Sequence, residues 1–208
     1  MAIRAVIFDF GGVLCFHPSD EKIARFSEKC GLPVAQFLEA FWNNRLEYDA
    51  GRLTPTEYWQ GVAESAGIHI GPADLPPLVR LEIELWNHYD QRVFAWIEQL
   101  RAANLRIGLL SNLPKPLGEE LRATRGFLDP FDHVTYSYEL KLVKPQLEIY
   151  QHSVAGLRVN PQEALFLDDR RVNVAGALEA GLQAEKYSSW EDFLASGAIE
   201  RWGLPRPE

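Results

Sequence analysis

The sequence predicts an α/β fold in which a parallel sheet carries helices on both faces and a helical segment is inserted after the first strand. Two observations predict this fold. From residue 89 onward, short apolar segments rich in branched side chains alternate with amphipathic segments, which is typical of a parallel sheet covered by helices. Residues 19–87, in contrast, show helical periodicity and capping signals without a convincing strand.

The first strand is expected over residues 4–9, "RAVIFD". Its residues between Arg4 and Asp9 are continuously apolar, as in strands that are buried on both faces of a parallel sheet. Gly11 and Gly12 follow at once and end the strand.

The inserted segment contains several helix signals. Thr54, Pro55 and Glu57 form a capping box with proline at the first helical position. Ser19 is a second N-cap, and the glycines that follow the periodic segments are typical helix ends. Helices are expected over residues 19–31, 34–51, 54–67 and 76–89.

The remaining elements alternate in type. A helix is expected around Val93 and Leu100, which belong to an i, i+3, i+4, i+7 apolar pattern. Further helices are expected over residues 117–124, 145–157 and 172–181, and strands over residues 105–112, 133–137, 164–169 and 184–188.

Composition limits the possible functions. The 208 residues include 47% apolar residues and carry a net charge of −8, so the chain can build a core and is a poor candidate for binding nucleic acid or anionic membranes. Two cysteines are too few for a disulfide framework, and no apolar run approaches a membrane span. A cytoplasmic location is expected, and the oligomeric state, monomer or dimer, stays open.

Polar residues stand where the predicted strands end. Because parallel strands share their carboxyl edge, these side chains should meet there. Converging carboxylates raise one another's pKa unless a hard cation such as Mg²⁺ compensates them, and hydroxyl, amide and ammonium groups donate to phosphate. The residues are Asp9, Ser111, Asn112, Lys144, Asp168 and Asp169.

Each of these residues also has an ordinary structural interpretation. Ser111 and Asn112 are acceptable turn residues before Pro114, and Lys144 taken alone reads as a solvated lysine. Asp168 is a candidate N-cap for the next helix. It is the combination, on the predicted strand ends, that favours a phosphate and metal site.

Four short motifs containing these residues occur in order: "FDFGGVL", "LLSN", "KP" and "FLDDRRVN". In this the chain resembles the haloacid dehalogenase-like hydrolase superfamily, and more narrowly its branch of bacterial sugar-phosphate phosphatases and the N-terminal phosphatase domain of soluble epoxide hydrolases. The resemblance implies a Rossmann-like catalytic core of residues 1–17 and 89–208, with residues 18–88 forming a helical cap domain.

The resemblance implies a Mg²⁺-dependent phosphatase. Asp9 would attack the phosphoryl group and become an aspartyl phosphate, which water then hydrolyses. Mg²⁺ would be held by Asp9, Asp169 and the backbone carbonyl of Gly11, with Asp168 supporting the ion or its waters. Ser111 and Lys144 would bind the phosphoryl oxygens, with Asn112 nearby. The implied substrate is a small phosphorylated metabolite, for which a sugar phosphate is one candidate.

The sequence departs from the family pattern at Gly11. Phosphatases of the superfamily usually carry there a second aspartate, which acts as general acid and base and is worth about 10²–10⁴-fold in rate. Three explanations are open: the substrate has a good leaving group, another residue supplies the proton, or the enzyme is slow or is not a phosphatase. His17 and Asp20 are the nearest substitutes, although His17 reads more simply as a hinge residue and Asp20 as part of a helix start.

Two other functions are compatible with these residues. A metal-independent 2-haloacid dehalogenase would use the same aspartate nucleophile and also lacks the second aspartate, but the pair Asp168–Asp169 speaks against it. A slow or non-catalytic phosphate-binding homologue is the other. Within the expected cap, the polar group Glu47, Tyr48, Asp49 and Arg52 is a candidate substrate contact, while Phe41, Trp42, Tyr58 and Trp59 are expected in its core.

Overall fold

A five-stranded, fully parallel sheet forms the centre of the computed structural model, which describes residues 2–207. Its strand order is β3-β2-β1-β4-β5. The predicted α/β class and the predicted strands are confirmed, and no helix among the described residues is long and apolar enough to cross a membrane. The strands are β1 (Ala5–Phe8), β2 (Arg106–Ser111), β3 (His133–Tyr136), β4 (Ala164–Asp168) and β5 (Gln183–Lys186).

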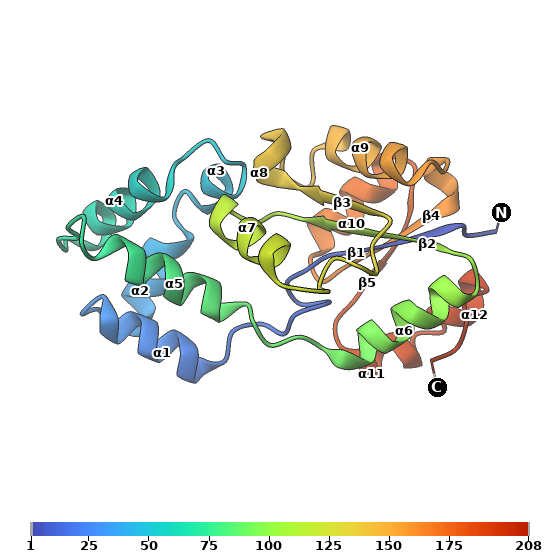
Figure 1. The fold of residues 1–208 in the computed structure, drawn as a ribbon, viewed down its shortest axis with the longest axis horizontal. Coiled ribbons are helices and arrows are strands. Elements are labelled where there is room, and N and C mark those ends of the chain that lie inside the picture. The colour runs from blue at the N-terminus through green and yellow to red at the C-terminus, as the bar shows by residue number, and fades with distance from the viewer. Residues whose placement is uncertain (1, 208) are drawn as a thin grey trace.

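Helices cover both faces of the sheet (Figure 1). The alternation of β1 explains this, because Val6 and Phe8 belong to one apolar cluster while Ala5 and Ile7 belong to another. The first cluster includes residues of α6 (Gln91–Ala102), α7 (Lys115–Ala123), α11 (Trp190–Ala195) and α12 (Ala198–Trp202). The second includes residues of α9 (Leu147–Leu157) and α10 (Arg171–Glu179).

The helical insertion, which we define as helices α1 to α5, lies to one side of the sheet (Figure 1). It has an apolar cluster of its own, which includes the aromatic rings of Phe26, Phe41 and Trp59 in tilted and edge-to-face contact. Thr54 and Glu57 form the predicted capping box. The helices are α1 (Asp20–Lys29), α2 (Val34–Trp42), α3 (Arg45–Asp49), α4 (Pro55–Ala66) and α5 (Leu75–Leu85).

Two predicted helices are wrong in their extent. The helix expected over residues 76–89 ends at Leu85. The segment 34–51 is divided into α2 and α3, because Asn43 is extended and Asn44 adopts the left-handed conformation with φ 56°. Asparagine enters that region more readily than most residues, but the apolar pattern continues across the break and hides it. Four further elements were not predicted: α11, α12, the short helix α8 (Ser137–Leu140) and the 3₁₀ turn Pro161–Glu163. Two of them carry local signals, because Ser189 caps α11 and Asn160 forms a capping box with Glu163.

The insertion contacts the sheet domain through its connecting segments, through α3 and through α5, whose Arg80 pairs with Glu120 of α7 at 3.2 Å. The two connecting segments pair with each other. Cys15 and Tyr89 form an antiparallel β-bridge, and the Phe16 amide donates to the His88 carbonyl at 2.9 Å. On the far side, Ser137 Oγ donates to the Asp49 carbonyl at 2.5 Å. The insertion is therefore held over the carboxyl edge of the sheet, while the exact domain boundaries stay a prediction.

Candidate active site

Three strands deliver polar side chains to one edge of the sheet. Phe8 is in register with Leu109 of β2 and Leu167 of β4, so the residues that follow them along the chain are neighbours. The edge opens into a cavity of about 770 Å³ between the sheet and the helical insertion. Of the residues predicted from the sequence, the cavity is lined by Asp9, Gly11, Ser111, Asn112, Lys144 and Asp169.

Lys144 connects two of the predicted carboxylates. Its buried Nζ lies 2.7 Å from Asp9 Oδ1 and 2.7 Å from Asp168 Oδ2, and it donates to the Leu110 carbonyl at 3.1 Å. Three acceptors thus match the three donors of an ammonium group. Burial alone would lower the pKa of Lys144, but the two carboxylates outweigh it and raise that pKa, so the side chain stays cationic.

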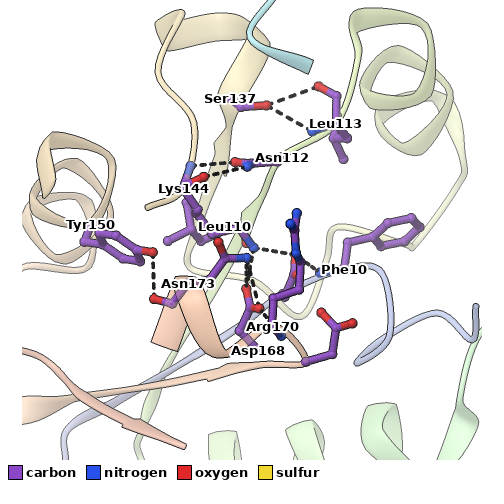
Figure 2. Close-up of polar contacts among 12 residues, drawn as sticks. Phe10, Leu110, Asn112, Leu113, Ser137, Lys144, Tyr150, Asp168, Arg170 and Asn173 are labelled. Atoms are coloured by element: carbon purple, nitrogen blue, oxygen red, sulfur yellow. Dashed lines mark hydrogen bonds and ion pairs between the residues drawn. The ribbon is translucent and has the colours of Figure 1, made fainter. Parts of the chain in front are cut away.

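Asp168 lies beneath the cavity and is fully engaged by donors (Figure 2). The Arg170 amide donates to its Oδ1 at 2.8 Å, and Asn173 Nδ2 lies 3.0 Å from each of its oxygens. Burial acts to raise the pKa of Asp168, yet Lys144 and these hydrogen bonds together hold it below its usual value. Asp168 is therefore a fixed anion that positions Lys144.

Asn173, the last residue of the motif "FLDDRRVN", is a site residue for which no role was predicted. It lies in the first turn of α10, where its amide reaches back to Asp168 and its carbonyl accepts from Tyr150 Oη at 2.8 Å. Its position five residues after Asp168, at the start of a helix, was the sequence signal that could have predicted its contact with Asp168.

Asp9 presents one oxygen to the cavity. Its Oδ1 accepts from the Phe10 amide at 2.7 Å and contacts Lys144, which leaves Oδ2 without a hydrogen-bond donor among residues 2–207. Burial, followed by the neighbouring charges of Asp168 and Asp169, raises the pKa of Asp9 to about 7 against the opposing effect of Lys144.

The donor set fits a hard divalent cation. Carboxylate oxygens of Asp9, Asp168 and Asp169 lie within 4.8 Å of one another, and every candidate ligand atom is an oxygen, as Mg²⁺ prefers. Asp168 and Asp169 add to the effect of burial in raising the pKa of Asp9, while Lys144 opposes it. Asp169 is partly exposed, which leaves room for the water molecules that Mg²⁺ usually keeps.

Asn112 is engaged by the chain around Lys144. Its Oδ1 accepts from the Lys144 amide at 2.8 Å, and its Nδ2 donates to the Lys144 carbonyl at 3.1 Å. These two contacts fix the backbone that carries the lysine (Figure 2). Ser111 is buried at the end of β2 and lines the cavity.

A side chain at residue 11 would overlap with Trp86 unless one of the two shifts. A Cβ atom there would lie 2.9 Å from Cζ3 of Trp86, the residue that follows α5. The indole ring thus occupies the position that an aspartate at residue 11 would need. Of the two substitutes considered, His17 lines the cavity with its Nε2 3.1 Å from Asp169 Oδ2, and Asp20 is the first residue of α1.

The expectations for the insertion are partly wrong. Of the polar group considered, Asp49 lines the cavity, whereas Glu47 pairs with Arg52 and Tyr48 is buried in the insertion's core. Trp42 is not in that core, because it is 51% exposed and lines the cavity.

Arg45, which the sequence analysis missed, forms a buried triad with Asp49 at 2.8 Å and Glu82 at 2.6 Å. The triad joins α3 to α5 beside the cavity. The spacing of four residues between Arg45 and Asp49 was a local signal for an ion pair on one helix, but the second partner, Glu82, is 37 residues away from Arg45.

A buried carboxylate at the end of β1, a lysine that bridges two aspartates and an oxygen-rich edge define a hydrolase site on a parallel α/β fold. The chain belongs to the haloacid dehalogenase-like hydrolase family, whose model matches residues 3–181. The resemblance inferred from the four motifs is confirmed.

Curated relatives differ in the reaction for which they are named. The chain is 26% identical to the D-ribitol-5-phosphate phosphatase of Bacteroides thetaiotaomicron, over 92% of this chain and 97% of that protein. It is 28% identical to the (S)-2-haloacid dehalogenase 4A of Burkholderia cepacia, over 86% and 80%.

A solved structure shares the fold. A haloacid dehalogenase family enzyme from Bacteroides thetaiotaomicron, crystallised with magnesium and inorganic phosphate, matches with a TM-score of 0.74 and 22% identity, covering 92% of this chain and 99% of that one.

Proposed function

We propose that the protein is a Mg²⁺-dependent phosphatase that acts on a small phosphorylated metabolite through an aspartyl phosphate at Asp9. The observation that carries the proposal is the meeting of three carboxylates within 4.8 Å at one sheet edge, with Lys144 buried between two of them. Such a set gathers more negative charge than a dehalogenating carboxylate needs. It suits a site that holds a cation beside a phosphoryl group.

The chain's own residues can carry both half-reactions. Asp9 Oδ2 attacks phosphorus, the bond from phosphorus to the ester oxygen breaks, and the alcohol leaves with a proton from water. A water molecule then attacks phosphorus, releasing inorganic phosphate and restoring the Asp9 carboxylate. Lys144 aligns Asp9 and places a positive charge beside the phosphoryl group, while the Ser111 hydroxyl donates to a phosphoryl oxygen. This is the positioning and charge stabilisation that phosphoryl transfer requires.

Mg²⁺ would be held by Asp9, Asp169 and the Gly11 carbonyl, with Asp168 near the ion. When bound, it would neutralise charge on the phosphoryl oxygens and reduce repulsion between phosphate and Asp9. Asn112 supports this site by fixing the backbone of Lys144. We also propose that residues 18–88 act as the cap domain and residues 1–17 and 89–208 as the catalytic core.

A metal-independent 2-haloacid dehalogenase is the second candidate. Gly11 and the relative from Burkholderia cepacia favour it, while the acidic pair at the end of β4 opposes it. An assay of three compounds separates the two reactions. Acetyl phosphate, p-nitrophenyl phosphate and 2-chloropropionate are each tested with Mg²⁺ and with excess EDTA.

We expect Mg²⁺-dependent phosphate release that EDTA abolishes. Asp9→Asn should reduce it by ~10⁴-fold or more while the circular dichroism spectrum stays unchanged. Chloride release from 2-chloropropionate in EDTA would establish the dehalogenase instead. Folded protein that releases neither product would favour the non-catalytic homologue.

A further inference from the structure

The cavity is much larger than its polar end requires. Its volume of about 770 Å³ falls within the roughly 300–1,000 Å³ of pockets that hold drug-sized ligands. Beyond the carboxylates it continues between the helices of the insertion, where its wall changes character. The apolar wall includes Ile23 of α1, Leu38, Phe41 and Trp42 of α2, Leu46 of α3 and Leu85 of α5.

The charged groups on this side of the cavity are already satisfied. Among residues 2–207, the charged side chains that the insertion contributes to the lining are those of Arg45 and Asp49. They pair with each other, and Arg45 also pairs with Glu82, with all three side chains less than a tenth exposed. A hydroxyl-rich ligand would lose water here without finding equivalent partners, which is unfavourable.

Apolar side chains also remain open to solvent at this cavity. Trp42 is 51% exposed and Leu46 is 49% exposed, although both line it. Arg45 stacks on the Trp42 ring at 5.7 Å, so the indole is held in place by its neighbour. A ligand that covers these side chains removes apolar surface from water, which is the main favourable contribution to binding in such pockets.

We propose that the substrate is the phosphate monoester of an apolar alcohol, an alkyl or alkenyl phosphate, whose hydrocarbon part lies against α2 and α3 while its phosphate lies at Asp9. This inference rests on the proposed phosphatase function and names its substrate class. The wall next to Gly11 is consistent with it, because Trp86 fills that position with the carbon edge of its indole ring rather than with a carboxylate. Each methylene buried in the cavity should improve binding about threefold to fourfold.

The test uses two chain-length series on the full-length protein with Mg²⁺. Butyl, hexyl, octyl and decyl phosphate are assayed for phosphate release, with ribitol 5-phosphate and acetyl phosphate alongside. The corresponding alkylphosphonates, whose carbon–phosphorus bond is not hydrolysed, are titrated by calorimetry. We expect kcat/KM and affinity to rise about threefold per methylene until the cavity is filled, and octyl phosphate to exceed ribitol 5-phosphate at least tenfold in kcat/KM.

Two variants locate the effect. Leu46→Gln, at a half-exposed position, should flatten the chain-length dependence in both series. Val34→Gln is the matched control, because Val34 is also exposed and lies in α2 outside the cavity wall; it should keep the wild-type dependence.

The possible failures are distinguishable. Hydrolysis of acetyl phosphate with no chain-length dependence, or with preference for ribitol 5-phosphate, would overturn the apolar substrate and leave the phosphatase standing. No hydrolysis of any phosphate would overturn the phosphatase, and the phosphonate titration would then decide whether the cavity selects alkyl chains. A dependence that Leu46→Gln leaves intact would also refute this placement.

Discussion

Replacing Gly11 by alanine tests the packing that excludes a second carboxylate. The new Cβ would lie 2.9 Å from Trp86 Cζ3, which is 0.5 Å less than the 3.4 Å at which ordinary contact begins. Overpacking of this kind costs about 1–3 kcal/mol. Alanine also has fewer backbone conformations than glycine in the unfolded chain, which stabilises the folded state by about 0.4–1 kcal/mol. Gly11→Ala should therefore lower the free energy of unfolding by about 1–2 kcal/mol.

Urea unfolding followed by circular dichroism measures this change in two backgrounds. Once Trp86→Ala has removed the ring, Gly11→Ala should no longer destabilise and should stabilise by about 0.4–1 kcal/mol. Gly61→Ala in α4 is the matched control, since a Cβ there meets nothing within 4 Å and the helix should gain stability in both backgrounds. An equal cost of Gly11→Ala with and without Trp86 would refute the packing explanation. By the same reasoning, Gly11→Asp should not speed hydrolysis while Trp86 is in place.

Three further predictions concern buried polar side chains of the insertion and of the site. Arg45→Met leaves Asp49 and Glu82 without their cation and should lower the free energy of unfolding by about 3–5 kcal/mol, measured by urea unfolding. Burial already raises the pKa of both carboxyl groups, so the folded form binds protons more tightly than the unfolded chain. The loss of stability should therefore be largest at neutral pH and shrink on acidification. A deficit that grows as the pH falls contradicts this. Lys144→Met should lower the free energy of unfolding by a similar ~3–5 kcal/mol and abolish turnover, and a stable, active variant would remove Lys144 from the site. Ser111→Ala loses a donor to a charged oxygen, worth about 1.5–3 kcal/mol, so kcat/KM should fall ~10–100-fold with unchanged stability; an unchanged kcat/KM would show that the hydroxyl does not contact the phosphoryl group.

The sheet and its polar edge could be predicted because their signals are local. A buried parallel strand such as β4 is a continuous apolar run, and the aspartates that end it follow directly in the chain. Parallel pairing then places Asp9 and Asp168 together without knowledge of any side-chain contact.

The remaining features depend on contacts between distant residues. The sequence shows that residue 11 is glycine but not that Trp86 lies against it. It shows Asn112 after a strand but not that its amide is occupied by the Lys144 backbone. The break at Asn44 and the exposure of Trp42 at the cavity likewise follow from how α2 packs, which an apolar pattern does not reveal. The roles of the site residues, the domain boundaries and the cytoplasmic location stay predictions.

The central claim is that a phosphoryl group passes to Asp9, and rapid acid quenching followed by mass spectrometry of the peptide containing it tests this most directly. With octyl phosphate or acetyl phosphate and Mg²⁺, the account predicts one added phosphoryl group on Asp9, formed and lost in step with turnover and missing in EDTA. Phosphate released in a burst while Asp9 stays unmodified at every time point, or a phosphoryl group found on another residue, would contradict it.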